Sequence, residues 1–396
     1  MNIMTISDDT LPSWGDYLNA LSEAESVLAS LSDPADPVQQ QEAYRLLFLS
    51  LASGFLTTFV DPDHPDFVPA VSNLLNSVGT NPDFIYASAS IDGRGVYRLT
   101  GERGEGLFLL FDLGAGGLGV TEELGPSTGL IDIDEFQLVD GRFDIILSAE
   151  KPAGYDGDWY QLDPSTVSCS VRQASYDWGA GREARFAIER VDAPMRPTPL
   201  AAAEVARRMM LLARFPQRFA SFALRYCKGQ RERGLVNQLE HDDWAGRGGL
   251  KGQHYYQGIF RLEPGKVLVL DTELPDRVRY WNVQLNDRHW NSIDWVNHQS
   301  SLNGGQARID PDGRFRAVIA LEDPGVPNWL DPGGQQEGSL MLRWTQASSG
   351  PAPELTLVPL EKLAAHLHPD TPQVSAQDRD AALRARRRGA QMRRRW

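Results

Sequence analysis

The sequence predicts a mainly β protein with helical additions: two tandem, related antiparallel β-sandwich or jelly-roll-like domains, an N-terminal helical cap and a helical linker. Three observations lead to this prediction. A stretch beginning DGRF at Asp140 returns in similar form, again beginning DGRF, at Asp312. Short apolar segments alternate with glycine-rich turns in both halves, which is typical of β-sandwiches. Helical periodicity lies outside these two regions.

The repeat has the length of a whole domain. Asp312 follows Asp140 by 172 positions, which is too long for a solenoid repeat and suits a duplicated domain. Pro152 matches Pro324 without a gap, and four extra residues in the first copy then bring Asp163 onto Asp331. Residues present in both copies are expected to serve the architecture, and residues present once are better candidates for function.

These signals divide the chain into five segments. Residues 1–80 form the helical cap, 81–195 the first β-sandwich, 196–252 a helical bridge and loop, 253–358 the second β-sandwich, and 359–396 C-terminal helices with an arginine-rich tail.

The cap is predicted to hold two helices and a short third one over Val68–Val78. Apolar residues from Trp14 to Leu31 recur at helical spacing, and Asp33-Pro34 ends this helix. A second helix starts near Asp36-Pro37, because proline suits the first helical turn, and runs to about Phe59. These helices are expected to cover the core or to form a dimer contact.

The first β domain consists of short strands between turns. The glycine string 114–119 follows a strand with no clear helix behind it, so it indicates a turn rather than a phosphate-binding loop. The strands are predicted at 84–90, 96–99, 107–112, 143–149, 167–172 and 186–189.

A helix between Pro197 and Cys227 is predicted to bridge the two β domains, because its apolar residues share one face. Ser375, with Asp378 three residues later, gives a helix N-cap signal for the arginine-rich end. The second β domain has predicted strands at 254–262, 266–271, 279–286, 307–309, 315–320, 339–344 and 354–358.

Composition limits the partners. A net charge of −14 argues against a general nucleic-acid binder, and the seven arginines among the last thirteen residues suggest a tail that is solvated or docks on a subunit. Leu46–Val60 is too short to span a membrane, the N-terminus has no signal core, and the two cysteines have no metal spacing. We therefore expect a cytoplasmic protein with no nucleic acid, no membrane, no cofactor and no metal, and with helical segments that could support a homo-oligomer.

Features found only in the second half indicate a ligand site. Six of the ten tryptophans lie between Trp244 and Trp344, and four of the seven histidines lie between His241 and His298. In the strand that ends at Asn286, alternation places apolar residues on one face and amides on the other, where they suit hydroxyl or amide groups of a ligand. The residues predicted to bind substrate are Tyr280, Asn282, Gln284, Asn286, Trp290, Asn291, Trp295, Asn297 and Trp329.

The loop that follows carries the predicted acid–base groups. His289 and His298 are candidate general bases, oriented by Asp287 or Asp294. A metal site made of His289, Asp294 and His298 is disfavoured, because the usual tight spacing is missing. The prediction is an enzyme with hydrolase or lyase chemistry on a small or medium organic substrate bearing hydroxyl, amide or ring groups. The alternative is a non-catalytic protein that binds a carbohydrate or aromatic ligand.

The order of motifs resembles one bacterial family, the domain-of-unknown-function 1214 family with its companion N-terminal region. The resemblance covers roughly residues 81–192 and 253–345 and implies tandem β-sandwich domains. It implies no established activity and no catalytic residues. The motifs are Asn81-Pro82-Asp83 with Tyr86, Arg172-Gln173, Asp177-Trp178, Arg279-Tyr280-Trp281, Asn286-Asp287, Asp310-Pro311-Asp312-Gly313, Asp323-Pro324-Gly325, Asn328-Trp329-Leu330 and Arg343-Trp344.

Overall fold

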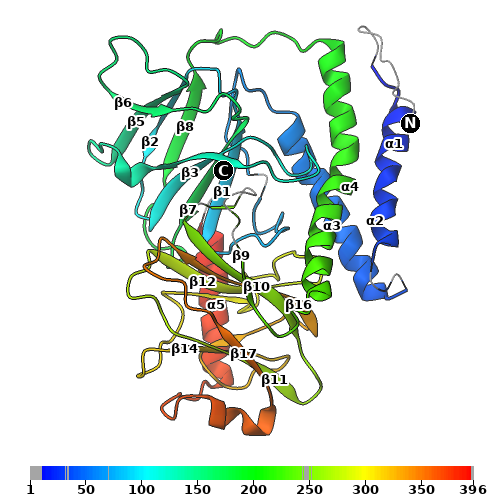
Figure 1. Ribbon diagram of the computed structural model, residues 1–396, viewed down its shortest axis with the longest axis vertical. Helices are drawn as coiled ribbons and strands as arrows, with labels where there is room; N and C mark the ends of the chain where they lie inside the picture. Colours follow the sequence, from blue (N-terminus) through cyan, green and yellow to red (C-terminus); the bar gives the residue numbers. More distant parts are fainter. Residues whose placement is uncertain are drawn as a thin grey trace.

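The computed structural model describes residues 11–393 except 32, 34, 70, 243, 245–248 and 251. Residues 1–10 of the predicted cap and 394–396 of the predicted tail lie outside this part of the chain. The protein is mainly β, as predicted, with two β-sandwiches one above the other and helices along one side (Figure 1).

The helices form a side layer and a separate C-terminal helix. In the layer, α4 is 31 residues long, continues through Pro216 and contacts both sandwiches. Its Arg218 donates to the Val120 carbonyl of the first sandwich at 2.7 Å, and its Arg231 donates to Glu337 of the second at 2.9 Å. The helices are α1 (Trp14–Leu21), η1 (Ser22–Glu25), α2 (Ser26–Ala29), α3 (Pro37–Thr58), η2 (Ile133–Glu135), α4 (Ala202–Glu232), η4 (Leu360–His366) and α5 (Ala376–Met392).

The first sandwich consists of two four-stranded sheets, ordered β1-β7-β3-β4 and β6-β5-β2-β8. Its strands are β1 (Phe84–Ser90), β2 (Tyr97–Glu102), β3 (Phe108–Gly114), β4 (Ser127–Asp132), β5 (Arg142–Ser148), β6 (Asp158–Gln161), β7 (Ser168–Ala174) and β8 (Arg185–Arg190).

The second sandwich has the sheets β13-β12-β16-β10-β9 and β15-β14-β11-β17. Its strands are β9 (Glu240–Asp242), β10 (Gln253–Arg261), β11 (Lys266–Thr272), β12 (Tyr280–Asn286), β13 (Ser301–Asn303), β14 (Phe315–Ile319), β15 (Trp329–Leu330), β16 (Glu337–Thr345) and β17 (Glu354–Pro359).

The two sandwiches share one strand order, which agrees with the repeat in the sequence. Sheet β1-β7-β3-β4 corresponds to β10-β16-β12-β13, and β6-β5-β2-β8 corresponds to β15-β14-β11-β17. Both second sheets end in a parallel pair, β5–β6 and β14–β15. Trp159 donates to Ser148 Oγ and Trp329 donates to the Ala320 carbonyl, each at 2.9 Å, and the two acceptors occupy equivalent positions.

One sheet of each sandwich faces the other sandwich. We call β1-β7-β3-β4 and β13-β12-β16-β10-β9 the inner sheets, and the remaining two the outer sheets. The inner sheets meet through aromatic rings, because the Tyr280 ring lies 5.0 Å from Phe84 and 6.0 Å from Phe108. The outer sheets therefore lie at opposite ends of the molecule.

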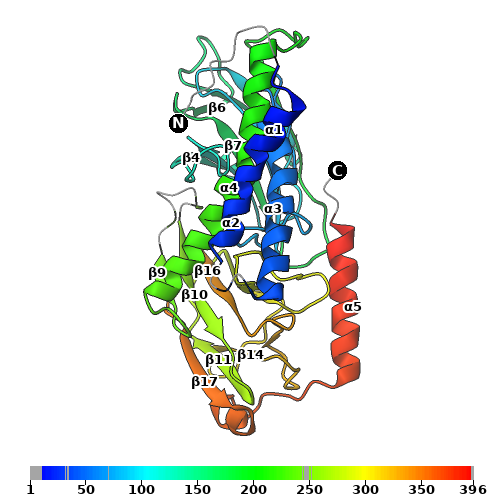
Figure 2. The same cartoon turned by 90° about the vertical axis from the view of Figure 1, so that its right-hand side faces the viewer.

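Helix α5 runs along the side of the molecule, apart from the layer of α1, α2, α3 and α4 (Figure 2). Its N-cap is Ser375, whose hydroxyl accepts the Asp378 N–H at 3.1 Å, as the sequence predicted. Arg379, Arg386 and Arg393 follow at intervals of seven. Arg379 bonds Asp323 of the second sandwich, whereas Arg393 bonds Glu183 of the first. One face of this helix therefore docks across both sandwiches of its own chain, whereas Arg384, Arg387 and Arg388 are exposed, as expected for a solvated tail.

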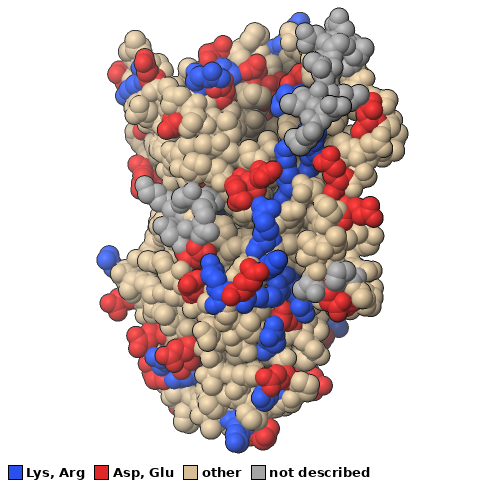
Figure 3. All heavy atoms as spheres, turned by 45° about the vertical axis from the view of Figure 1, so that its right-hand side comes forward, with Lys and Arg blue, Asp and Glu red and all other residues tan. Residues whose placement is uncertain are grey.

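Helix α4 carries a row of basic side chains. Figure 3 shows basic side chains in a row along the helical side of the molecule, with acidic side chains beside them. Arg207 pairs with Glu204 at 2.7 Å and Arg225 pairs with Glu123 at 3.2 Å.

Among the described residues, no helix is long and apolar enough to cross a membrane.

Candidate functional site

The polar face of β12 lies between the two sandwiches, and this differs from the expected ligand-facing surface. The apolar residues of this strand enter the core of the second sandwich, as alternation predicts. The opposite residues are buried against the first sandwich, so no open surface remains for a ligand there. These opposite residues are Tyr280, Asn282, Gln284 and Asn286, each at most 1% exposed.

Hydrogen bonds tie this face to the segment before β1. The Tyr280 hydroxyl lies 2.7 Å from Asp83 Oδ2 and 3.0 Å from Asn81 Oδ1. Asn282 Nδ2 donates a hydrogen bond to Asn81 Oδ1 at 3.2 Å, and Gln284 Nε2 donates one to Asn286 Oδ1 at 2.8 Å. The amide row therefore satisfies buried polar groups of the domain interface.

Two arginines at equivalent positions also lie in this interface. Arg172 of β7 pairs with Asp112 at 3.1 Å. Arg343 of β16 donates to Gln284 Oε1 at 2.6 Å and to the Gly79 carbonyl at 2.8 Å. The first copy thus balances its arginine with a carboxylate, whereas the arginine of the second copy donates to neutral oxygens.

Asp83 is the most enclosed carboxyl group of this interface. It is 1% exposed, and its Oδ1 accepts from Trp178 Nε1 at 2.9 Å and from Asn303 Nδ2 at 2.6 Å. Burial raises the pKa of Asp83, because the charged form loses its hydration. The Tyr280 hydroxyl donates to Asp83 Oδ2, so this carboxyl group accepts hydrogen bonds from Tyr280, Trp178 and Asn303.

The predicted pairing of Asp287 with a catalytic histidine ring is not what the structure shows. Asp287 Oδ1 accepts the backbone N–H groups of His289 at 2.9 Å and Asn291 at 2.8 Å, and Oδ2 accepts from Asn291 Nδ2 at 2.8 Å. The ring of His289 instead lies 3.3 Å from the Gln39 carbonyl of α3, and burial lowers its pKa. Asp287 closes a turn that packs against the helical layer.

His298 has a different carboxylate partner from the two that were expected. Its Nδ1 lies 2.7 Å from Asp331 Oδ2, and this hydrogen bond raises the pKa of His298. Its side chain is 41% exposed. Asp294 accepts from the Asn297 side chain at 2.7 Å and caps its own turn. Within the described residues no hydrogen bond or ion pair joins His289 to His298, and no group of three or more potential ligands could hold a metal ion.

The three predicted tryptophans are packing residues in this structure. Trp290 stacks on Tyr226 of α4 at 4.0 Å, and Trp295 packs with Trp178 beneath α5. Trp329 lies beneath η4, with the guanidinium of Arg379 5.3 Å from its ring. These three tryptophans pack helices against the second sandwich.

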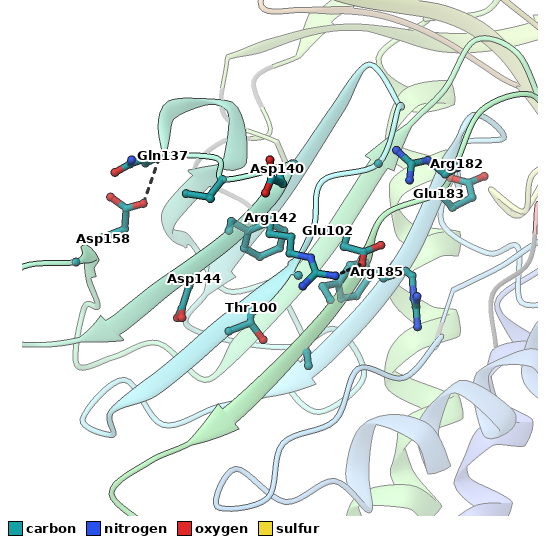
Figure 4. Close-up of a pocket in the computed structure, with 18 of the residues that line it drawn as sticks. Thr100, Glu102, Gln137, Asp140, Arg142, Asp144, Asp158, Arg182, Glu183 and Arg185 are labelled. Atoms are coloured by element: carbon teal, nitrogen blue, oxygen red, sulfur yellow. Dashed lines mark hydrogen bonds and ion pairs between the residues drawn. The ribbon is translucent and has the colours of Figure 1, made fainter.

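A large open cavity lies elsewhere, on the outer sheet of the first sandwich. It measures about 1760 Å³ and is open to solvent. Figure 4 shows Arg142, Glu102 and Thr100 between Asp158 at one edge and Glu183 at the other. We call this cavity the hollow.

The corresponding outer sheet of the second sandwich is covered. Leu363 of η4 packs on Val269, Val318 and Val358 there. The residues at equivalent positions explain why one outer sheet is open and the other covered. Arg98 pairs with Ile146 in the first sandwich, and at the same place in the second sandwich Val269 pairs with Val318. A charged residue thus stands in the first sandwich where the second has an apolar one, and the first face stays open.

The charges in the hollow are of both signs, and several of them are paired. Its lining includes three arginines and six acidic residues. Arg142 lies 3.4 Å from Glu102, and Glu183 is held by Arg393 at 3.1 Å. Tyr155 supplies an aromatic ring at the rim, and burial raises its pKa.

Sequence reasoning missed the hollow, although one signal for it was present. Tyr155 lies between Pro152 and Trp159, where the first copy is longer than the segment between Pro324 and Trp329 of the second. An insertion in one copy of a duplication marks a feature that the shared architecture does not need.

Comparisons with known proteins agree with the motif order. The family model described as "Protein of unknown function (DUF1214)" matches residues 261–349. The crystal structure of an uncharacterized protein from Burkholderia cenocepacia is similar, with 30% identity, a TM-score of 0.82 and coverage of 88% of this chain and 97% of that chain.

The chain belongs to the DUF1214 family. A protein from Vibrio parahaemolyticus matches at a TM-score of 0.45 and 11% identity, over 79% of this chain and 98% of that one, a likeness too low to support any statement. A search of curated proteins finds no match. The DUF1214 match covers β11 to β16 of the second sandwich, so the hollow lies outside it.

Proposed function

We propose that this DUF1214 protein binds a carbohydrate, without catalysis, in the hollow of the first sandwich. The observation that carries the proposal is the pair of equivalent outer sheets, of which one is covered by η4 and the other is open, polar and hollowed. An uncovered sheet face placed by a rigid sandwich is a common location for binding.

The chemistry of the lining supports a neutral, hydroxyl-rich ligand. Arg142 and Glu102 offer donors and acceptors side by side, and Thr100 adds a hydroxyl between strands. The ring of Tyr155 offers an apolar face with a polar tip. Because charges of both signs are present and several of them already have partners, the hollow favours a neutral polar ligand over a strongly charged one.

The test uses two arginines at the same position of the repeat. Arg142 begins β5 in the hollow, and Arg314 directly precedes β14 on the covered sheet, where it pairs with Asp271 at 2.7 Å. We expect titration calorimetry against a panel of soluble glycans to show binding by the wild type and by Arg314→Ala. Arg142→Ala should bind at least about tenfold more weakly, a loss of about 1.4 kcal/mol. Equal binding by the two variants would contradict the proposed location.

A second candidate is an acid–base enzyme that uses His298. The partly exposed ring has Asp331 behind Nδ1, which leaves Nε2 able to take a proton from a substrate. This supports the hydrolase or lyase alternative, with Asp331 as the orienting group in place of Asp294. Turnover of a glycan bound in the panel, lost in His298→Gln but kept in His289→Gln, would favour it over simple binding.

The helical layer supports a further proposal, that two copies associate through α3. Tyr44, Phe48 and Phe55 are exposed on this helix, and isolated surface aromatics are normal but a row of them indicates an interface. Phe48→Glu should then shift the protein to a smaller species in light scattering.

We also propose a cytoplasmic location, because Cys169 and Cys227 are buried and unpaired.

A further inference from the structure

The shape of the hollow bears on the size of its ligand, and this inference rests on the proposed function. The lining comes from all four strands of the outer sheet: Asp158 of β6, Arg142 of β5, Thr100 of β2 and Arg185 of β8. Neighbouring strands lie about 4.8 Å apart, so four strands span about 14 Å. A single sugar ring covers only part of this width.

The volume leads to the same conclusion. At about 1760 Å³ the hollow exceeds the roughly 300–1,000 Å³ of a pocket for one small molecule. It is also open to solvent, so nothing encloses a single ring from all sides. A ligand longer than the hollow can therefore lie across it and continue at both ends.

Polar groups form a row across this width, because Glu102 of β2 is the register partner of both Arg142 of β5 and Arg185 of β8. Glu102 with Arg142 and Asp144 with Arg98 are two ion pairs on adjoining parts of the outer sheet. Each pair presents donors and acceptors to solvent, so the floor offers more than one equivalent contact for hydroxyl groups.

The two rims differ, which gives the hollow a direction. Tyr155, in the loop that is longer in the first copy, stands at the β6 end. Glu183 and Arg185 stand at the β8 end, where Arg393, the residue after α5, fixes Glu183 at 3.1 Å. An aromatic ring at one end, and at the other end a carboxylate fixed by Arg393 with the Arg185 guanidinium nearby, can contact two separate sugar units.

We propose that the hollow binds a linear chain of sugars across its four strands, with one unit stacked on Tyr155 and another held at Glu183 and Arg185. Each unit adds contacts, so affinity depends on chain length. Arg393 acts as a positioning residue, because it touches Glu183 and not the ligand.

The experiment is a length series measured by titration calorimetry. The probes are glucose, xylose, mannose and N-acetylglucosamine, together with their linear β-linked oligomers from dimer to hexamer. For the sugar that binds, we expect the affinity to rise by at least about tenfold between the monomer and the tetramer and then to level off. Tyr155→Ala and Arg185→Ala should each flatten this rise, whereas Arg314→Ala should leave it unchanged.

The possible failures are distinct. A monomer that binds in the hollow as tightly as the hexamer would overturn the chain-ligand inference and leave the proposed carbohydrate binding intact. Absence of binding by every probe would overturn both. A length dependence that Tyr155→Ala and Arg185→Ala leave unchanged would place the chain elsewhere and also overturn the inference.

Discussion

The two sandwiches have the same strand order but opposite outer faces. The second sandwich buries its outer sheet under Leu363 of η4, where Val269 and Val318 are apolar. The first sandwich has Arg98 at the position of Val269 and leaves its sheet open as the hollow. The duplicated architecture is thus retained in both copies, whereas the surface chemistry has diverged. The copy with more tryptophan and histidine is the one that is packed shut.

The largest expected effects come from the two equivalent arginines of the inner sheets, Arg172 and Arg343. Arg172→Leu leaves the buried Asp112 carboxylate without its cation, which should cost about 3–5 kcal/mol in the free energy of unfolding. Arg343→Leu removes a donor from neutral oxygens and should cost about 1–3 kcal/mol. Urea unfolding measures both.

The double variant Arg172→Leu/Asp112→Leu serves as the control, because it removes both charges and should recover much of the loss. Equal losses for the two single variants would contradict the difference between the two copies.

The cover of the second sandwich gives the next effect. Leu363→Ala should lower the free energy of unfolding by about 2–4 kcal/mol, since this buried side chain seals an apolar sheet face. Leu360→Ala, in the same η4 turn but 47% exposed, should cost less than about 0.5 kcal/mol. A small effect of Leu363→Ala in urea unfolding would mean that η4 is not a structural cover.

The contact of α3 with the second sandwich should depend on pH. Burial, together with the nearby Asp287 carboxylate, raises the pKa of Glu42 to about 7. Its Oε2 has no hydrogen-bond partner among the described residues. The neutral form is therefore favoured in the folded protein. The stabilisation that the neutral carboxyl group contributes is fully present below about pH 4.3, the pKa of glutamate in the unfolded chain. It is lost as the pH rises through about 7, the pKa of Glu42 in the folded protein.

Glu42→Gln should remove this dependence, which amounts to at most about 4 kcal/mol. His289 has the opposite pH dependence. Burial lowers the pKa of its ring, so the stabilisation that the neutral ring contributes is lost as the pH falls. The difference between wild type and Glu42→Gln, followed by thermal unfolding from pH 4 to pH 8, isolates the carboxyl group. A constant difference across this range would contradict the assignment.

Much of the fold could be predicted from the sequence, because repeats and alternation report on backbone and core. The start of α3 at Pro37 and the cap of α5 at Ser375 follow from local chemistry. Strand β13 was missed, because Ser301–Asn303 is short and polar and pairs only through contact with β12. No strand forms at 307–309, where one was expected, and β13 lies a few residues earlier in the chain.

The site was harder to predict, for a physical reason. An amide row such as Asn282 and Gln284 has one sequence pattern whether it faces a ligand or another domain, and only the tertiary contact decides. Here the first sandwich covers it. The longer loop that carries Tyr155 was visible in the repeat, but the greater density of aromatic residues in the other half outweighed it.

The smallest expected effect on stability is at the hollow itself. Tyr155→Ala should change the free energy of unfolding by less than about 0.5 kcal/mol, because this residue lies on a surface loop outside the core. Urea unfolding checks this expectation. A loss comparable with that of Leu363→Ala would mean that Tyr155 serves the architecture rather than a ligand.

The most direct test of the difference between the two outer sheets is a crystal structure with the tightest-binding oligosaccharide of the length series. We predict that the sugar chain lies across β6, β5, β2 and β8, with a ring on Tyr155 and hydroxyls at Arg142 and Arg185. A chain bound instead on the second sandwich or beside His298, with the hollow empty, would contradict the account.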